Sequence, residues 1–174
     1  YPGFDNNRLT NVMEADYYSQ LLNDNARPMY SRATQEKTAP GSTFKPLSAM
    51  AGLCEGVIST SPSDTITCTG VYTKVSNHPK CWILTQNGGS HGTENVIDAI
   101  MDSCNCYFYE VGFRLGSTGN GLSNEIGLEK LANYATMFGL GDKSGLETEE
   151  SEPQISDETI VPSAIGQGSH NYTV

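Results

Sequence analysis

The sequence predicts an α+β fold that is mainly helical, with few and short strands. Apolar residues recur at helical spacing in several segments, whereas residues 59–92 are rich in Ser, Thr, Gly and Asn. Within that polar region, residues 65–69 and 81–84 have the composition of short strands. A chain of 174 residues suits one domain or a large piece of one. Its hydrophobic content of 37% is low for a self-sufficient core.

Two helices are predicted in the first third of the chain. Residues 12–23 form the first, and its inward side chains are expected to be Tyr18, Leu21 and Leu22. Residues 42–55 form the second, which follows a Pro-Gly turn and ends at Gly56.

Two longer helical segments are predicted in the second half. Residues 94–115 are helical around Ser-Cys-Asn at 103–105, with a core stripe that consists of Val96, Ile97, Ile100 and Met101. The aromatic run at 107–109 is interpreted as core packing. Residues 124–138 form the last helix, and Gly139 suits the left-handed position that often follows a helix. Its inward positions are Leu128, Leu131 and Ala135.

A serine and a lysine lie three positions apart in the run Pro-Gly-Ser-Thr-Phe-Lys-Pro, residues 40–46. On a helix, Ser42 and Lys45 share one face. A serine hydroxyl is a poor nucleophile until a neighbouring base takes its proton, and a lysine can be that base if burial lowers its pKa. The alternative is an N-capping serine followed by a surface lysine, because a bare Ser-x-x-Lys pair often occurs by chance. The seven-residue run is much rarer.

This run resembles the active-site serine box of the penicillin-binding proteins, in which the serine is the nucleophile. Ser-Cys-Asn at 103–105 resembles their second box in its Ser-x-Asn form, and the flanking segments resemble a class B transpeptidase domain. By this resemblance Ser103 relays protons near Lys45, while Asn105 hydrogen-bonds Lys45 and the substrate amide. The alternative for the second box is a polar pair that caps or interrupts a helix.

The resemblance implies the penicillin-binding and serine β-lactamase-like transpeptidase fold, mainly its helical subdomain, with the closing strands missing. Residues 1–174 are therefore expected to form a partial transpeptidase domain. Lys143-Ser144-Gly145 matches the third Lys-Thr-Gly box, but its flanks are not strand-like, so we interpret it as a loop and the third box as absent. The oxyanion hole needs the backbone N–H of Ser42 and a second N–H from the absent strand. The chain as given is expected to be inactive or weakly active.

The function implied by the resemblance is that of a serine D,D-transpeptidase. Ser42 attacks a peptidoglycan stem peptide, forms an acyl-enzyme and passes the acyl group to an amine, and β-lactam antibiotics acylate the same serine. No cofactor is needed for this chemistry. The expected location is the extracytoplasmic face of the bacterial cytoplasmic membrane, with the membrane anchor outside this chain. Two alternatives are a non-catalytic β-lactam sensor domain and a serine β-lactamase, although no residue that could activate a water is evident near the two boxes.

The charge of the chain argues against nucleic acid as a partner. Ten basic and 20 acidic residues give a net charge of −10 and a pI of about 4.6, so a basic patch for nucleic acid or anionic lipid is not expected. The acidic residues between 147 and 158 are interpreted as a solvated loop, because their spacing lacks a metal-loop pattern. No transmembrane stretch or signal peptide is visible in the sequence.

Four residues could form a structural zinc site: Cys68, Cys81, His91 and Cys104. Three thiolates and one imidazole are a common tetrahedral zinc set, and some class B enzymes are similar in binding zinc close to the second box. A Cys68–Cys81 disulfide and free thiols remain as alternatives, and Cys106 could replace Cys104 as a ligand. Cys54 is expected to be buried, and the two histidines without an evident partner, His78 and His170, are expected at the surface.

Overall fold

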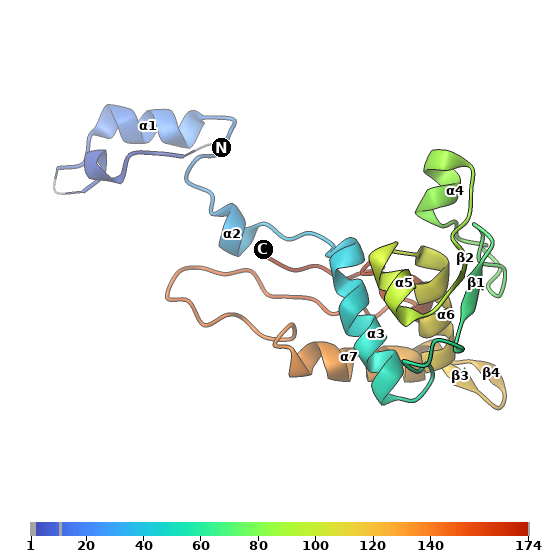
Figure 1. The fold of residues 1–174 in the computed structure, drawn as a ribbon. Coiled ribbons are helices and arrows are strands. Elements are labelled where there is room, and N and C mark those ends of the chain that lie inside the picture. The colour runs from blue at the N-terminus through green and yellow to red at the C-terminus, as the bar shows by residue number, and fades with distance from the viewer. Residues whose placement is uncertain (1–2, 11, 174) are drawn as a thin grey trace.

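The computed structural model describes residues 3–10 and 12–173 as an assembly of helices with two very small sheets (Figure 1). The helices are η1 (Asn6–Arg8), α1 (Ala15–Asn23), α2 (Arg32–Gln35), η2 (Gly41–Phe44), α3 (Lys45–Cys54), α4 (Trp82–Asn87), α5 (Val96–Met101), α6 (Asn105–Leu115), α7 (Asn124–Met137) and α8 (Ile160–Ser163). The strands are β1 (Ile66–Cys68), β2 (Gly92–Glu94), β3 (Ser117–Thr118) and β4 (Gly121–Leu122).

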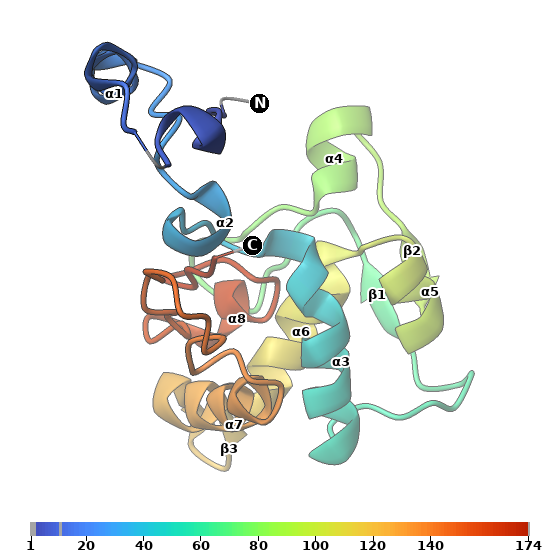
Figure 2. The ribbon, with the colours of Figure 1, turned by 90° about the vertical axis from the view of Figure 1, so that its left-hand side faces the viewer.

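Helix α6 is the centre of the fold, and α3, α7 and α8 pack around it (Figure 2). Most of its residues are buried, including Tyr107 and Phe108, which are fully shielded from solvent. A helix that is apolar nearly all round is stable only when other elements cover every face. The run at 107–109 therefore packs in the core, as predicted.

Helix α8 approaches α6 and α7 closely because glycines face it. A Cβ at Gly112 would lie 2.8 Å from the Cβ of Ala164, and a Cβ at Gly127 would lie 2.6 Å from Cγ1 of Ile160. The segment after α8 then crosses the turn before α3. There the amide of Gly41 donates to the carbonyl of Gly166 (2.9 Å), and Gly166 has a φ of +72°, which favours glycine. A Cβ at Gly166 would overlap the Gly41 carbonyl, so this crossing requires glycine.

The larger of the two sheets brings distant residues together. Strands β1 and β2 are antiparallel, with Cys68 opposite Gly92. Cys68 therefore lies next to the residue that follows His91. Strands β3 and β4 form a short hairpin before α7.

The N-terminal segment with η1 and α1 extends away from the helical core in both views (Figures 1 and 2). Among the residues that the structure describes, no helix combines the length and the apolar character needed to cross a bilayer.

The prediction of a strand at residues 81–84 was wrong. Cys81 is the N-cap of α4, which runs from Trp82 and ends at Gly88 with a φ of +71°. Short apolar runs of this kind do not distinguish a strand from one turn of helix. The other predicted strand, at 65–69, contains β1.

The helical segment predicted at 94–115 contains two helices, α5 and α6, with a turn at Ser103 between them. Asn95 caps α5 by accepting from the amides of Ile97 and Asp98. The predicted core stripe was largely wrong, because Val96 is buried at 4% exposure whereas the other three positions are open to solvent. Their exposed fractions are 67% for Ile97, 42% for Ile100 and 73% for Met101.

The remaining helices follow the predictions more closely. Helix α7 ends as expected, with Gly139 at a φ of +76°, and Leu131 and Ala135 are buried. Three further predictions were wrong. Leu22 and Cys54, which were expected to be buried, are exposed, and His170, which was expected at the surface, is buried. His78 is exposed, as predicted.

Candidate active site

Ser42 lies in the one-turn helix η2, directly before α3. Gly41 before it has a φ of +57°, and the hydroxyl of Thr43 donates to the carbonyl of Pro40 (2.7 Å), which closes the turn. The Ser42 side chain is exposed, and its hydroxyl has no hydrogen bond to any residue that the structure describes. The sequence Pro-Gly-Ser-Thr thus presents a free hydroxyl at the mouth of a helix.

Lys45, the first residue of α3, is buried at 2% exposure. Its Nζ donates to the Ser103 carbonyl (2.6 Å), the Ser103 hydroxyl (3.0 Å) and Oδ1 of Asn105 (2.6 Å). The structure therefore brings together Lys45, Ser103 and Asn105, three of the four predicted catalytic residues, across a separation of 60 positions in the chain.

The turn between α5 and α6 presents these acceptors. Ser103 has a φ of +51°, a left-handed conformation that is uncommon for a residue with a side chain. Cys104 follows as the N-cap of α6, and its sulfur accepts from the amide of Tyr107. The tight turn lets Ser103 and Asn105 face Lys45, while the buried Cys104 points elsewhere.

Burial lowers the pKa of Lys45 from 10.5 to about 8, and the nearby Cys81, Cys104 and Glu94 oppose this shift. Desolvation is the largest cause, because a buried ammonium loses its hydration. A substantial fraction of Lys45 is therefore neutral near physiological pH and can accept a proton.

The three acceptors restrict how Lys45 can exchange a proton. The ammonium has three N–H donors, which match the three oxygens around it. The neutral amine has two donors and one lone pair. Of the three oxygens only the Ser103 hydroxyl can turn and donate to that lone pair, because the other two belong to C=O groups. Neutral Lys45 can thus take a proton through the Ser103 hydroxyl, which lines the same cavity as Ser42.

A cavity of about 400 Å³ opens between these groups. It is lined by Gly41, Ser42, Trp82, Ser103, Asn105, Ile165 and Gln167. Ser42 and the residues of the second box therefore face one shared space. Its volume suits a small ligand or part of a peptide.

The segment after α8 forms one wall of this cavity and is held by His170. The centroid of the imidazole ring lies 4.3 Å from that of the Phe44 ring. Nδ1 of His170 accepts a hydrogen bond from the Ser156 amide (3.1 Å), and its Nε2 lies 3.2 Å from the carbonyl oxygen of Ser163. Burial lowers its pKa to about 4, so His170 is neutral.

Sequence analysis missed His170, Trp82 and Gln167 as residues of the site, because the position of each depends on contacts between distant segments. The one available indication was that Trp82 is the single tryptophan of the chain.

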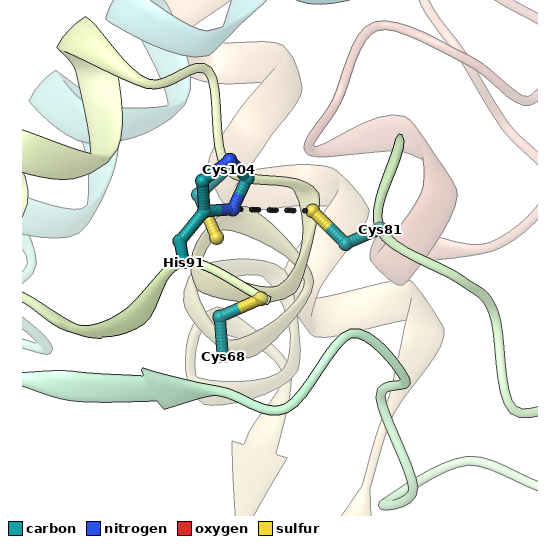
Figure 3. Close-up of side chains that lie close together, drawn as sticks. All are labelled: Cys68, Cys81, His91 and Cys104. Carbon is teal, nitrogen blue, oxygen red and sulfur yellow. Dashed lines mark hydrogen bonds between the residues drawn. The ribbon is translucent and has the colours of Figure 1, made fainter. Parts of the chain in front are cut away.

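The four predicted metal-binding residues converge behind this turn (Figure 3). The candidate ligand atoms of Cys68, Cys81, His91 and Cys104 all lie within 4.8 Å of one another. Sulfur ligands around a tetrahedral zinc, at about 2.3 Å from the ion, are separated by roughly 3.8 Å. The donor set and its spacing therefore fit zinc with only a small contraction.

The cysteines carry no disulfide. All five are free thiols, so the structure does not support a Cys68–Cys81 bridge. Hydrogen bonds from the thiols of Cys104 and Cys106 hold the pKa of Cys81 far below its usual range, whereas the bond to Cys81 raises the pKa of Cys104. The cluster thus favours one thiolate, shared by neighbouring thiols.

Lys143 and Ser144 lie outside this site, in an exposed loop. Nζ of Lys143 pairs with Glu152 (2.7 Å), and the Ser144 hydroxyl donates to Glu150 (2.9 Å). Neither residue lines the cavity around Ser42. Their location agrees with the interpretation of this Lys-Ser-Gly sequence as a loop.

Comparison with known proteins finds one family for the whole chain. The model of the penicillin binding protein transpeptidase domain matches residues 2–174. The peptidoglycan D,D-transpeptidase MrdA of Haemophilus influenzae is 36% identical over 149 residues, which are 86% of this chain and 21% of that protein. MrdA of Escherichia coli K12 is 28% identical over 183 residues, with 96% of this chain and 26% of that protein covered. The chain thus spans about a fifth to a quarter of the length of these relatives.

Solved structures agree on the fold. A structure of Pseudomonas aeruginosa PBP2 in complex with WCK 5153 matches with a TM-score of 0.80 and 25% identity, over 99% of this chain and 39% of that one. The imipenem acyl-enzyme complex of penicillin-binding protein A from M. tuberculosis matches with a TM-score of 0.77 and 22% identity, over 99% and 38% of the two chains.

Proposed function

The chain belongs to the penicillin-binding protein transpeptidase family, class B, and from that premise we propose that it is part of a serine D,D-transpeptidase that cross-links peptidoglycan stem peptides. We assign residues 1–174 to the helical part of its catalytic domain. The observation that carries the proposal is the buried Lys45, which is hydrogen-bonded to Ser103 and Asn105, two residues that line the same cavity as Ser42.

In the proposed acylation, neutral Lys45 takes the hydroxyl proton of Ser42, directly or through the Ser103 hydroxyl. The Ser42 oxygen forms a bond to the penultimate D-Ala carbonyl carbon, and the backbone N–H of Ser42 donates to the oxyanion. Collapse of the tetrahedral intermediate breaks the amide bond, and the proton held by Lys45 passes to the leaving D-Ala amine. Asn105 holds the substrate amide.

In the second half-reaction, an amine from a neighbouring stem peptide attacks the Ser42 ester. Its proton passes back through Lys45 to the Ser42 oxygen, so that the new amide forms and the free serine returns. A β-lactam enters the first step in the same way, because its strained amide presents a carbonyl to Ser42. It then leaves a long-lived ester, since no amine displaces it.

The test is to incubate the full-length protein with a fluorescent penicillin and with a D-Ala-D-Ala stem peptide. We expect a covalent adduct that maps to the peptide containing Ser42 and lasts for many minutes, together with D-Ala release from the stem peptide when an acceptor amine is present. Rapid loss of the adduct with hydrolysed penicillin as product would indicate a serine β-lactamase instead. A stable adduct without any D-Ala release would indicate a β-lactam sensor.

We propose that the protein works at the extracytoplasmic face of the bacterial cytoplasmic membrane. The support for this location is the substrate, because the peptidoglycan that a D,D-transpeptidase cross-links lies outside that membrane. The net charge of −10 gives no support to a nucleic acid partner.

We further propose that Cys68, Cys81, His91 and Cys104 hold a structural zinc ion. The fit of the donor set and its spacing support this assignment, as does the low pKa of Cys81, because thiolates are the form that binds zinc. A zinc ion bound there would cross-link β1 to the turn between α5 and α6. The proposed catalysis needs no step at the metal.

Removal of one ligand is expected to release the zinc. The full-length protein should contain close to one zinc per chain, and Cys68→Ser should lower zinc affinity at least about a hundredfold and reduce the melting temperature by several degrees. The measurements are elemental analysis and thermal melting with and without a strong chelator.

The matched control for this experiment is Cys54→Ser, since Cys54 is exposed on α3 and lies outside the cluster. It should retain both zinc and stability. Absence of zinc from the unmodified protein would contradict the proposal. If Cys106→Ser released zinc and Cys104→Ser retained it, the assignment of the fourth ligand would be wrong.

A further inference from the structure

Trp82 makes a contact with the active-site turn that the proposed mechanism does not use. It is the first residue of α4 and is half-buried. Its indole Nε1 lies 3.0 Å from the carbonyl oxygen of Ser103 and 3.2 Å from that of Asp102. An indole has one N–H donor, so both carbonyls share one hydrogen.

The Trp82 indole contacts Ser103, the residue of the turn that has a left-handed backbone conformation. A left-handed conformation is unfavourable for a residue other than glycine, and Ser103 has a φ of +51°. The Ser103 carbonyl accepts from Trp82 and from Lys45, at 3.0 and 2.6 Å, so both of its lone pairs are used. The two donors together hold the carbonyl in one direction and oppose relaxation of the turn.

The residue before Trp82 holds the other end of the same turn. The amide of Asn105 donates to the sulfur of Cys81 at 3.3 Å. Two consecutive residues, Cys81 and Trp82, therefore bind the turn on both sides of Cys104. The Trp82 ring also lies 5.3 Å from the ring of His91, so it is packed between the cysteine cluster and the cavity.

We propose that Trp82 is a positioning residue for acylation, which acts through Ser103. Its N–H fixes the Ser103 carbonyl, and that carbonyl fixes Nζ of Lys45 beside the Ser103 hydroxyl. Without this bond the turn has an unpaired carbonyl lone pair and more freedom to rotate, so Lys45 spends less time aligned with Ser42. Catalysis is sensitive to such small losses of alignment. This inference rests on the proposed function.

The test replaces only the N–H. In the full-length protein, Trp82→3-benzothienylalanine keeps the shape of the indole but has sulfur in place of the N–H group. We expect the acylation rate constant at saturating penicillin to fall roughly tenfold, as for the loss of one hydrogen bond worth about 1.4 kcal/mol. The penicillin concentration that gives half the maximal rate should stay within about twofold, because the ring that faces the cavity keeps its shape.

Two further variants complete the experiment. Trp82→Phe also lacks the donor and should show a similar loss of the rate constant, and Gln86→Ala, at an exposed position on the same helix, should leave both constants unchanged. An unchanged rate constant in the benzothienyl variant would overturn the inference. So would a change confined to the half-saturating concentration, which would make Trp82 a substrate-binding wall. Failure of the unmodified protein to react with penicillin would instead contradict the proposed function itself.

Discussion

Substitution of Ser42 by alanine is expected to abolish covalent labelling of the full-length protein by penicillin. Alanine has no atom that can form the ester, and the loss of a catalytic serine in other enzymes costs on the order of a millionfold in rate. Ser42 is exposed and its hydroxyl makes no hydrogen bond to the described residues, so the folded state loses no internal interaction. The melting temperature should therefore stay the same while labelling, followed by gel fluorescence and intact mass, disappears.

The neighbouring hydroxyl provides the matched control. Thr43→Val removes a hydroxyl one position away that is already bonded to the carbonyl of Pro40. This variant should keep its labelling within about tenfold, with a small loss of stability for the broken turn bond. A stable adduct on Ser42→Ala, or loss of labelling in Thr43→Val alone, would show that the nucleophile has been wrongly assigned.

The helices were predictable where local sequence decides their ends. Helix α7 has a serine cap, apolar residues at helical spacing and a glycine directly after it, and each of these features acts within a few residues. The burial of α5 was not predictable in this way. Ile97, Ile100 and Met101 have the spacing of a core stripe, but the rest of the fold leaves that face uncovered. Periodicity shows that a face is apolar and does not show what lies against it.

The candidate catalytic residues were predictable because they belong to short sequence motifs. Ser42, Lys45, Ser103 and Asn105 came from two short motifs, and the structure places Lys45 in contact with the second of them. The four candidate zinc ligands came from their residue types and from the resemblance to class B enzymes. The antiparallel pairing of β1 with β2 brings Cys68 next to the residue that follows His91, and the four candidate ligand atoms lie within 4.8 Å of one another. Trp82 and His170 could not be found in the same way. Their positions depend on contacts between distant segments, such as those of Trp82 with the Ser103 carbonyl and of His170 with the Ser156 amide and the Ser163 carbonyl. Residue type and spacing do not indicate such contacts.

The pH dependence of acylation is expected to follow Lys45. A general base works in its neutral form, and the pKa of Lys45 is lowered to about 8, mainly by burial. The rate constant should therefore rise with pH through about 8 and level off above it. A rate that is flat between pH 6 and 9 would contradict this role for Lys45.

Replacement of Lys45 separates its role as a base from its role as a hydrogen-bond donor. Lys45→Met removes both, whereas Lys45→Arg keeps a charged donor that cannot lose its proton near neutral pH. Both variants should acylate at least about a hundredfold more slowly, since general bases contribute roughly a hundredfold to ten-thousandfold and neither side chain can accept the proton of Ser42 near neutral pH. Lys45→Arg should melt at the higher temperature of the two, because its guanidinium can still donate to the oxygens of Ser103 and Asn105. Rapid acylation of Lys45→Arg would mean that Lys45 acts only as a donor and that another group accepts the proton of Ser42.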